Sequence, residues 1–515
     1  MRLGRAAAAI AAAAWLLSLP ALAEGDGAAA QTVWPTKGWA VSTPEAQGLD
    51  SGALARLVES VGKYPQDSLL VVRHGRIVLE AYYAPYEAGI PHDLRSVTKS
   101  VVGTLTGITV EQGLLAGTGE KVAELFADRK IAHLDARKQA ITVQNLLDMS
   151  SGIEWVEKNY TPDETIIRMY GARDRTSFVL DQPMSDAPGT RFQYNGGNPY
   201  LLSALVTKKT GKSAFDFAQG ALFRPLGITS ADWGKTDKQG VTNGEAGLFL
   251  TPRDMARLGY LYLEGGVWEG KRLIPADWVA AARAGKVEAT YGFHYGELWW
   301  SLPEKDAYMA RGRHSQLILV LPKLDMIAVM TGVLRDDEYY SPSRLIDEIA
   351  ASVKSDGPLP EDKVARSLLD AALRQTRRER PSPVGRTSPL AKAISGKVYR
   401  FAENRLHVKS VALTLTGPSP RWTIVTDGSG GDEGHTRFSG LIGLDGSYRK
   451  SPRAWYGIDA AKGTWQDARR FVLERRILGH GETQRWTLAF DGKKLDVRLE
   501  TTDGFKAELR GEAKE

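Results

Sequence analysis

Ser96-Val97-Thr98-Lys99-Ser100-Val101-Val102-Gly103-Thr104-Leu105-Thr106-Gly107-Ile108 is the stretch that decides the fold of the first part of this chain. Its apolar residues recur at the spacing of a helix, at Val97, Val101, Leu105 and Ile108. This period predicts a buried helix that begins at Ser96 and ends near Gly113. Gly103 and Gly107 would let neighbouring elements approach it closely.

Ser96 and Lys99 place a hydroxyl and an amine three residues apart, so both lie on one face of that helix. The backbone N–H groups and the dipole at a helix start favour an anion, such as the one that forms during acyl transfer. An amine near an apolar helix start is desolvated, which favours its neutral form. The pattern therefore predicts a nucleophile with an uncharged base beside it.

The same Ser-x-x-Lys spacing occurs a second time, at Ser60 and Lys63. That copy precedes Tyr64-Pro65, where no following helix could bury the lysine. Spacing alone does not separate a catalytic Ser96 from a serine that only caps its helix. Both interpretations stay open at this level.

The remainder of residues 41–355 predicts strands at both ends with helices between them, which describes an α+β domain whose single sheet uses distant parts of the chain. The predicted strands form two hairpins, 68–72 with 76–82 around His74, and 316–321 with 326–330. The predicted helices cover 143–149, 199–211, 251–265 and 343–353.

The composition changes after residue 355. Proline, arginine and other charged residues crowd into 356–392, which predicts a linker with one short helix. Residues 393–515 then show about eight short alternating runs separated by Gly/Asp turns, which predicts an antiparallel β-barrel or sandwich. We find no nucleophile-base pattern in this all-β part.

The first 23 residues have the charged start, the Ala/Leu-rich middle and the Ala21-Leu22-Ala23 end of a secretory signal peptide. The apolar run is shorter than the roughly 20 residues that a membrane anchor needs. Residues 24–40 resemble a tether, and no later run is apolar for long enough to cross a bilayer. We therefore expect an exported protein, either periplasmic or secreted.

The composition narrows the classes of function. The chain of 515 residues has no cysteine, so disulfides, thiolate metal sites and cysteine nucleophiles are excluded. Its eight histidines show no metal-ligand spacing, and its net charge of +6 is spread out, so we expect no metal, no cofactor and no nucleic-acid partner. The expected partner is a small molecule, and the oligomeric state stays open.

Four motifs occur in order: Ser96-Val97-Thr98-Lys99, Leu146 to Gly152, Pro188-Gly189-Thr190-Arg191-Phe192-Gln193-Tyr194, and Gly312-Arg313-His314-Ser315-Gln316. From about Gly48 to Lys354 the chain thus resembles the serine β-lactamase and penicillin-binding-protein superfamily, in particular its class C-like group of esterases, peptidases and 6-aminohexanoate-dimer hydrolases. The implied fold is a β-lactamase-like antiparallel sheet with a helical region, followed by the barrel-like domain.

The resemblance also implies roles for individual residues. Ser96 would attack a carbonyl, and Lys99 and Tyr194 would share its proton. Arg313 and His314 would supply positive charge for the substrate or for Tyr194, in the segment that continues with Ser315 and Gln316. The backbone N–H groups of Ser96 and Gln316 would form the oxyanion hole.

Two departures bear on the substrate. An Asn follows Tyr194 directly instead of two residues later, and Arg313-His314-Ser315 replaces the Lys-Thr-Gly that grips a β-lactam carboxylate. Both favour an esterase or amidase over a dedicated β-lactamase. The aromatic residues 291–295 and 299–300 would either line an acyl pocket or fill the core.

The alternatives within enzymes are a carboxylesterase, a 6-aminohexanoate-dimer-type amidase, and a peptidoglycan D,D-peptidase with weak β-lactam reactivity. The alternative from another class is a non-catalytic binding protein on the same fold. An α/β-hydrolase is a poor second choice, because the sequence has no Gly-x-Ser-x-Gly elbow.

Overall fold

The computed structural model describes residues 32–335, 337–338, 340–429 and 434–513. The chain divides into two units, Met1–Thr32 and Val33–Glu515, and every element described below belongs to the second. The predicted signal peptide lies outside the described residues. Among the residues described, no helix combines the length and the apolar character that crossing a bilayer requires.

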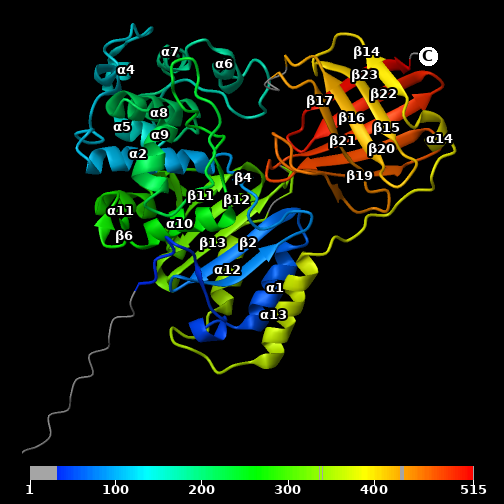
Figure 1. Cartoon of the computed structure of the whole chain (residues 1–515). Coiled ribbons are helices and arrows are strands. Elements are labelled where there is room, and N and C mark those ends of the chain that lie inside the picture. Colours follow the sequence, from blue (N-terminus) through cyan, green and yellow to red (C-terminus); the bar gives the residue numbers. More distant parts are fainter. Residues whose placement is uncertain (1–31, 336, 339, 430–433, 514–515) are drawn as a thin grey trace, which may run out of the picture. The chain divides into compact units, whose positions relative to one another are not determined.

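The first sheet has nine strands in the described part of the chain and joins segments far apart in sequence (Figure 1). In spatial order they are β1 (Ala40–Val41), β3 (Arg76–Tyr82), β2 (Gln66–Arg73), β13 (Met326–Gly332), β12 (Gln316–Leu321), β11 (Ala307–Gly312), β10 (Trp299–Leu302), β9 (His294–Gly296) and β8 (Val287–Glu288). All neighbours are antiparallel except β1 and β3. The two predicted hairpins, β2–β3 and β12–β13, are confirmed, and β2 pairs with β13.

The central strands are buried on both faces, so alternate residues enter two different cores. In β2, Leu70 and Val72 belong to one core, whereas Leu69 and Val71 belong to the other. The first core is covered by α2 (Val97–Glu111), α10 (Pro252–Leu263) and α11 (Ala276–Ala284), and the second by α1 (Ser51–Val61), α12 (Pro342–Ser352) and α13 (Lys363–Thr376).

Helix α13 lies inside the predicted linker 356–392 and packs against α1, as Figure 1 shows. Leu369 and Ala372 bury its apolar side in the core that α1 also enters. This part of the linker is therefore attached to the sheet domain. The exact domain boundaries stay a prediction.

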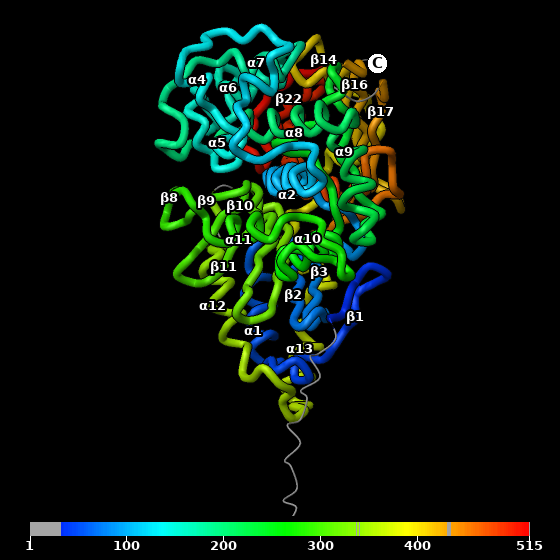
Figure 2. Tube along the Cα trace, turned by 90° about the vertical axis from the view of Figure 1, so that its left-hand side faces the viewer, coloured from blue at the N-terminus to red at the C-terminus, as the bar shows by residue number. Residues whose placement is uncertain are grey.

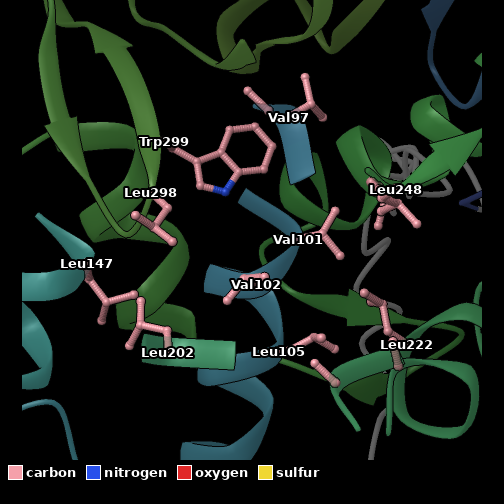
Figure 3. Close-up of a cluster of buried hydrophobic side chains, with 14 of the residues drawn as sticks. Val97, Val101, Val102, Leu105, Leu147, Leu202, Leu222, Leu248, Leu298 and Trp299 are labelled. Carbon is pink, nitrogen blue, oxygen red and sulfur yellow. The ribbon is translucent and has the colours of Figure 1, made fainter. Parts of the chain in front are cut away.

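Helix α2 is buried along nearly its whole length, as its sequence predicts, and it lies between the sheet and a region of shorter helices (Figures 1 and 2). The helical region comprises α3 (Val122–Leu125), α4 (Ala136–Ala140), α5 (Val143–Leu147), α6 (Thr165–Gly171), α7 (Arg175–Leu180), α8 (Gly197–Thr210) and α9 (Ala214–Ala218). Leu147 of α5 and Leu202 of α8 meet Val102 on one side of α2, and Leu298 and Trp299 also pack there (Figure 3). This packing fixes where Ser96 lies.

Gly103 shows why α2 needs glycine at a contact point. A Cβ atom at this position would lie 2.6 Å from the carbonyl oxygen of Glu297, which is too close for any other residue without a shift of the backbone. The turn before β10 therefore rests directly on the helix.

Two buried carboxyl groups, Asp148 and Glu297, lie beside this contact and share the side-chain amide of Gln144. Burial, together with the charge of Asp148, raises the pKa of Glu297 to about 7. Because the folded pKa lies above the unfolded value, this group's favourable contribution is complete below about pH 4.5 and is lost as the pH rises to about 7.

We therefore expect Glu297 to lower the free energy of unfolding by roughly 2–3 kcal/mol between pH 4.5 and pH 7.5. Urea denaturation of the wild-type protein and of Glu297→Gln across this range measures the effect as a difference between the two slopes. Equal slopes for both proteins would show that Glu297 titrates normally.

The second sheet has ten antiparallel strands within described residues 393–429 and 434–513, and it forms a nearly closed barrel (Figure 1). The strands are β14 (Val398–Phe401), β15 (Val408–Thr414), β16 (Arg421–Thr426), β17 (Arg437–Leu441), β18 (Arg449–Lys450), β19 (Asp459–Trp465), β20 (Arg470–Ile477), β21 (Thr483–Asp491), β22 (Lys494–Thr501) and β23 (Lys506–Ala513), preceded by α14 (Leu390–Ile394). The edge strand β17 comes close to β19 at the other side of the sheet. A tightly packed apolar core fills the interior.

The predicted number of about eight strands is too low, because β18 and β19 were missed. Strand β18 has two residues, and β19 carries Ala460, Ala461 and Gly463 where a β-branched run would be expected. A Cβ at Gly463 would lie 2.3 Å from the Phe471 ring, so packing against β20 requires glycine at this position.

Candidate active site

Ser96 occupies the N-cap position of α2, but its side chain does not cap the helix. The preceding residue, Arg95, has a φ of +50°, an uncommon conformation for a residue with a side chain, and it turns the chain into the helix. The Ser96 hydroxyl instead accepts a hydrogen bond of 2.9 Å from Lys99 Nζ. This contact argues against the interpretation of Ser96 as a simple cap.

Lys99 is buried, with 1% of its surface exposed. Its ammonium also donates to Glu245, at 2.8 Å to the carbonyl oxygen and 3.1 Å to Oε2. Burial alone lowers the pKa of Lys99, but the nearby Tyr194, Glu245 and Glu157 outweigh it and raise the pKa well above its usual value. The resting site therefore holds a charged lysine.

The charge on Lys99 differs from the uncharged amine that the sequence predicts. Desolvation acts as expected, but the fold also brings the carboxylate of Glu245 to Lys99 from 146 residues away, and no local sequence pattern indicates this contact. A buried cation is stable when an anion compensates it. Glu245 is in turn held by the hydroxyl of Tyr170, which donates to its other carboxylate oxygen.

Tyr194 lies next to this pair, with the centroid of its ring 5.1 Å from Lys99 Nζ. It sits in extended chain just before α8, and the backbone there is anchored by a 2.8 Å hydrogen bond from the N–H of Gln193 to the carbonyl of Met149 in the second motif. The structure thus brings Ser96 and Lys99 of the first motif together with Tyr194 of the third.

The aromatic residues before β11 divide between the two roles that the sequence left open. Trp300 stacks on Tyr194, with ring centroids 6.0 Å apart, and also contacts Phe192. Trp299 instead packs in the core against Tyr262. Of these two tryptophans, Trp300 therefore contacts a candidate site residue, and Trp299 belongs to the core.

The fourth motif forms the tight connection between β11 and β12, with His314 and Ser315 at positive φ. A Cβ atom at Gly312 would lie 2.4 Å from the carbonyl oxygen of Leu94. The end of β11 therefore approaches the segment just before Ser96 as closely as backbone can, which explains the glycine.

The four predicted residues of this motif differ in where their side chains lie. Arg313 lines a cavity together with Ser96. The buried His314 ring bonds to the carbonyl of Leu334, the Ser315 hydroxyl accepts from Gln66, and the Gln316 amide donates to the carbonyls of His314 and Gly332. These three side chains hold the connection in place. The oxyanion hole of the Ser96 and Gln316 backbone N–H groups stays a prediction.

The cavity beside Ser96 has a volume of about 570 Å³ and is shared by both sheets of the unit. It is lined by Arg95, Ser96, Asn159, Tyr160, Thr161, Pro162, Tyr170, Glu245, Ala246, Arg313, Arg405 and residues 503–506. Its size suits a small organic molecule. The described residues bring together no group of three or more histidine or acidic side chains that could hold a metal ion.

The sequence analysis missed two residues at this site, Glu245 and Asp503. Glu245 follows Asn243-Gly244 in a stretch without periodicity, and Asp503 belongs to an ordinary turn of the barrel. No local pattern marks either one. Each gains its role only through a contact across the fold, with Lys99 and with Arg313 respectively.

A known family of proteins matches most of the first sheet domain of this chain. The family model described as Beta-lactamase matches residues 54–338, more than half of the chain, so the chain belongs to the Beta-lactamase family. It is a hydrolase of that family, and its described fold has the family's sheet followed by the nearly closed barrel.

Three similar proteins illustrate the range of the family. The 6-aminohexanoate-dimer hydrolase of Paenarthrobacter ureafaciens is 27% identical over 284 residues, which are 51% of this chain and 71% of that protein. A putative D-alanyl-D-alanine carboxypeptidase of Escherichia coli is 21% identical, over 49% of this chain and 73% of that protein. A putative beta-lactamase from Bacteroides dorei has a similar fold, with a TM-score of 0.50, 18% identity, and coverage of 60% of this chain and all of the other.

Proposed function

We propose that this protein hydrolyses an ester or amide bond of a small molecule through an acyl-Ser96 intermediate. The observation that carries the proposal is the 2.9 Å hydrogen bond between Lys99 Nζ and Ser96 Oγ at the start of a buried helix. Burying the charge of Lys99 costs stability, and the Ser96 hydroxyl that it contacts does not cap the helix. A role in catalysis would explain why this arrangement is present.

In the proposed mechanism, Tyr194 is the base, and the Lys99 ammonium lies 5.1 Å from the centroid of its ring and bonds to Ser96 Oγ. Tyr194 takes the proton of Ser96 Oγ as that oxygen attacks the substrate carbonyl. The backbone N–H groups of Ser96 and Gln316 would stabilise the oxyanion, and Tyr194 returns the proton to the leaving alcohol or amine. A water molecule then attacks the acyl carbonyl and gives a proton to Tyr194, which passes it to Ser96 Oγ as the acid leaves.

The substrate we favour is a neutral ester or a linear amide. Support comes from the replacement of Lys-Thr-Gly by Arg313-His314-Ser315 and from the similarity to the 6-aminohexanoate-dimer hydrolase. The D,D-peptidase alternative has the weaker similarity to the putative carboxypeptidase in its favour. The non-catalytic alternative does not explain the buried Lys99–Glu245 pair, whose lysine also donates to the hydroxyl of Ser96.

A substrate panel tests the proposal. We expect steady release of nitrophenol from 4-nitrophenyl butyrate, slower cleavage of a linear aminohexanoate dimer and little turnover of nitrocefin, all absent in Ser96→Ala. Faster turnover of nitrocefin than of the ester would favour the β-lactamase alternative. An unreactive wild-type protein with a native circular dichroism spectrum would favour the binding protein.

We also propose that the protein is exported, on the signal-peptide pattern of residues 1–23. Amino-terminal sequencing of protein collected outside the cytoplasm should begin at Glu24. Protein that stays in the cytoplasm with Met1 intact would contradict this.

A further inference from the structure

The turn between β22 and β23 comes from the barrel, yet it forms part of the wall around Ser96. Asp503, Gly504 and Phe505 in this turn line the same cavity as Ser96, about 400 residues earlier in the chain. The barrel therefore contributes directly to the candidate active site. Its chemistry there depends on the one acidic residue of the turn, Asp503.

Asp503 contacts two arginines that line the cavity, Arg313 and Arg95, and the buried ring of His314. Its Oδ1 lies 3.1 Å from Arg313 Nη1 and 2.5 Å from His314 Nε2, and its Oδ2 lies 3.6 Å from Arg95 Nη2. The other ring nitrogen of His314 is held by the carbonyl of Leu334 at 2.6 Å, so this imidazole is fixed in orientation. The carboxylate of Asp503 thus sits on a preformed set of donors.

Asp503 remains ionised under ordinary conditions. Burial alone would raise its pKa, but the His314 hydrogen bond and the charges of Arg95 and Arg313 lower it to about 2. A fixed negative charge therefore lies beside the residue that the sequence predicts as the substrate's cation, Arg313. A substrate carboxylate that approached Arg313 would meet a like charge in a site of limited solvent access.

The other cations around the cavity are also engaged. Arg95 lies 3.2 Å from a carboxylate oxygen of Asp93, Lys506 lies 3.7 Å from one of Glu500, and Arg405 donates to the carbonyl of Lys506. The other acidic residue that lines the cavity, Glu245, forms an ion pair with Lys99. Because Arg405 bonds to a neutral carbonyl, these pairs leave a small excess of positive charge in the walls, and the negative charge that a substrate meets beside Arg313 is that of Asp503.

We propose that Asp503 determines specificity by occupying the donors of Arg313, Arg95 and His314, so that the site rejects substrates with a carboxylate near the scissile bond and accepts uncharged ones. This inference rests on the proposed function. It assigns the barrel a role in substrate selection.

Two pairs of matched esters test it. The pair 4-nitrophenyl pentanoate and mono-4-nitrophenyl glutarate differs by a carboxylate on the acyl side, and the pair phenyl butyrate and 3-carboxyphenyl butyrate differs on the leaving-group side. We expect the wild-type kcat/KM to favour the neutral member of at least one pair by tenfold or more. Equal values within both pairs would overturn the proposal without any variant.

Asp503→Asn keeps the size of the side chain and one acceptor oxygen while it removes the charge. We expect this variant to raise the acidic-to-neutral ratio of kcat/KM at least tenfold in the pair that the wild type discriminates, mainly through a lower KM for the acidic ester. Asp503→Glu should restore the wild-type ratio. The control Asp496→Asn, an exposed barrel residue paired with Arg510, should leave it unchanged.

The outcomes separate this inference from the proposed function. If Asp503→Asn lowers both members of a pair equally, Asp503 has a structural role only and the specificity proposal is wrong, although Ser96 hydrolysis stands. If the wild-type protein cleaves none of the four esters, this inference is wrong, and the proposed function fails as well if the linear aminohexanoate dimer is not cleaved either.

Discussion

Lys99→Met should lower kcat for ester hydrolysis by about 10³-fold, within the range typical for the loss of a group that assists proton transfer. The substitution removes the ammonium that bonds to Ser96 Oγ and lies over the Tyr194 ring. Without this charge beside both side chains, proton transfer from Ser96 to Tyr194 slows. We expect KM to change little, because Lys99 is buried and is not among the residues that line the cavity.

Lys138→Met is the matched control for this experiment. Lys138 is also buried, and its ammonium donates to the carbonyls of Ala132, Leu180 and Gln182, away from Ser96. Its loss should reduce stability while kcat per folded molecule stays near the wild-type value. If Lys99→Met kept kcat within fivefold of wild type, or if both variants lost activity equally, Lys99 would not take part in the chemistry.

Asp67→Asn should reduce the free energy of unfolding by about 3–5 kcal/mol, the typical cost of breaking a buried ion pair from one side. Asp67 in β2 is completely buried, and both its carboxylate oxygens accept from Arg476 of the barrel strand β20, at 2.7 and 2.9 Å. His92 lies against the same carboxylate at 3.1 Å. The substitution would leave the buried guanidinium of Arg476 without its anion.

The pH dependence of Asp67 adds a second readout. Burial alone would raise its pKa, but Arg476 and His92 outweigh it and lower the pKa. Its contribution is therefore complete above the unfolded value of about 3.9 and is lost as the pH falls through the lower folded value. Urea denaturation at pH 7 and near pH 3 should show a smaller difference between wild type and Asp67→Asn at the lower pH.

The control is Asp491→Asn, which breaks the exposed pair with Arg469 on the barrel surface. Exposed pairs contribute little, so we expect no measurable change. A loss of stability in Asp67→Asn no larger than in this control would mean that the junction between β2 and β20 contributes nothing to folding.

The sequence predicts the parts of this molecule that depend on local pattern. The buried helix after Ser96 and both hairpins of the first sheet follow from periodicity over ten or so residues, and packing on both sides of α2 supports the same pattern. Strand β19 could not be predicted in this way. The Phe471 ring requires glycine at position 463, which has a low strand propensity.

The electrostatics of the site could not be predicted in the same way. The charge of Lys99 depends on Glu245, and Arg313 pairs with Asp503. In both cases the partner lies more than a hundred residues away in the sequence and is brought close only by the tertiary fold. Residue types near Ser96 therefore indicate the reaction, whereas the charge state of the site and its expected selectivity depend on the whole fold.

The most direct test of the account is the site of covalent attachment. After brief exposure of the wild-type protein to a fluorophosphonate, intact-protein mass spectrometry should show one adduct, and peptide mapping should place it on Ser96, with no adduct on Ser96→Ala. An adduct on another residue such as Ser60, or equal labelling of Ser96→Ala, would contradict the assignment of Ser96 as the nucleophile.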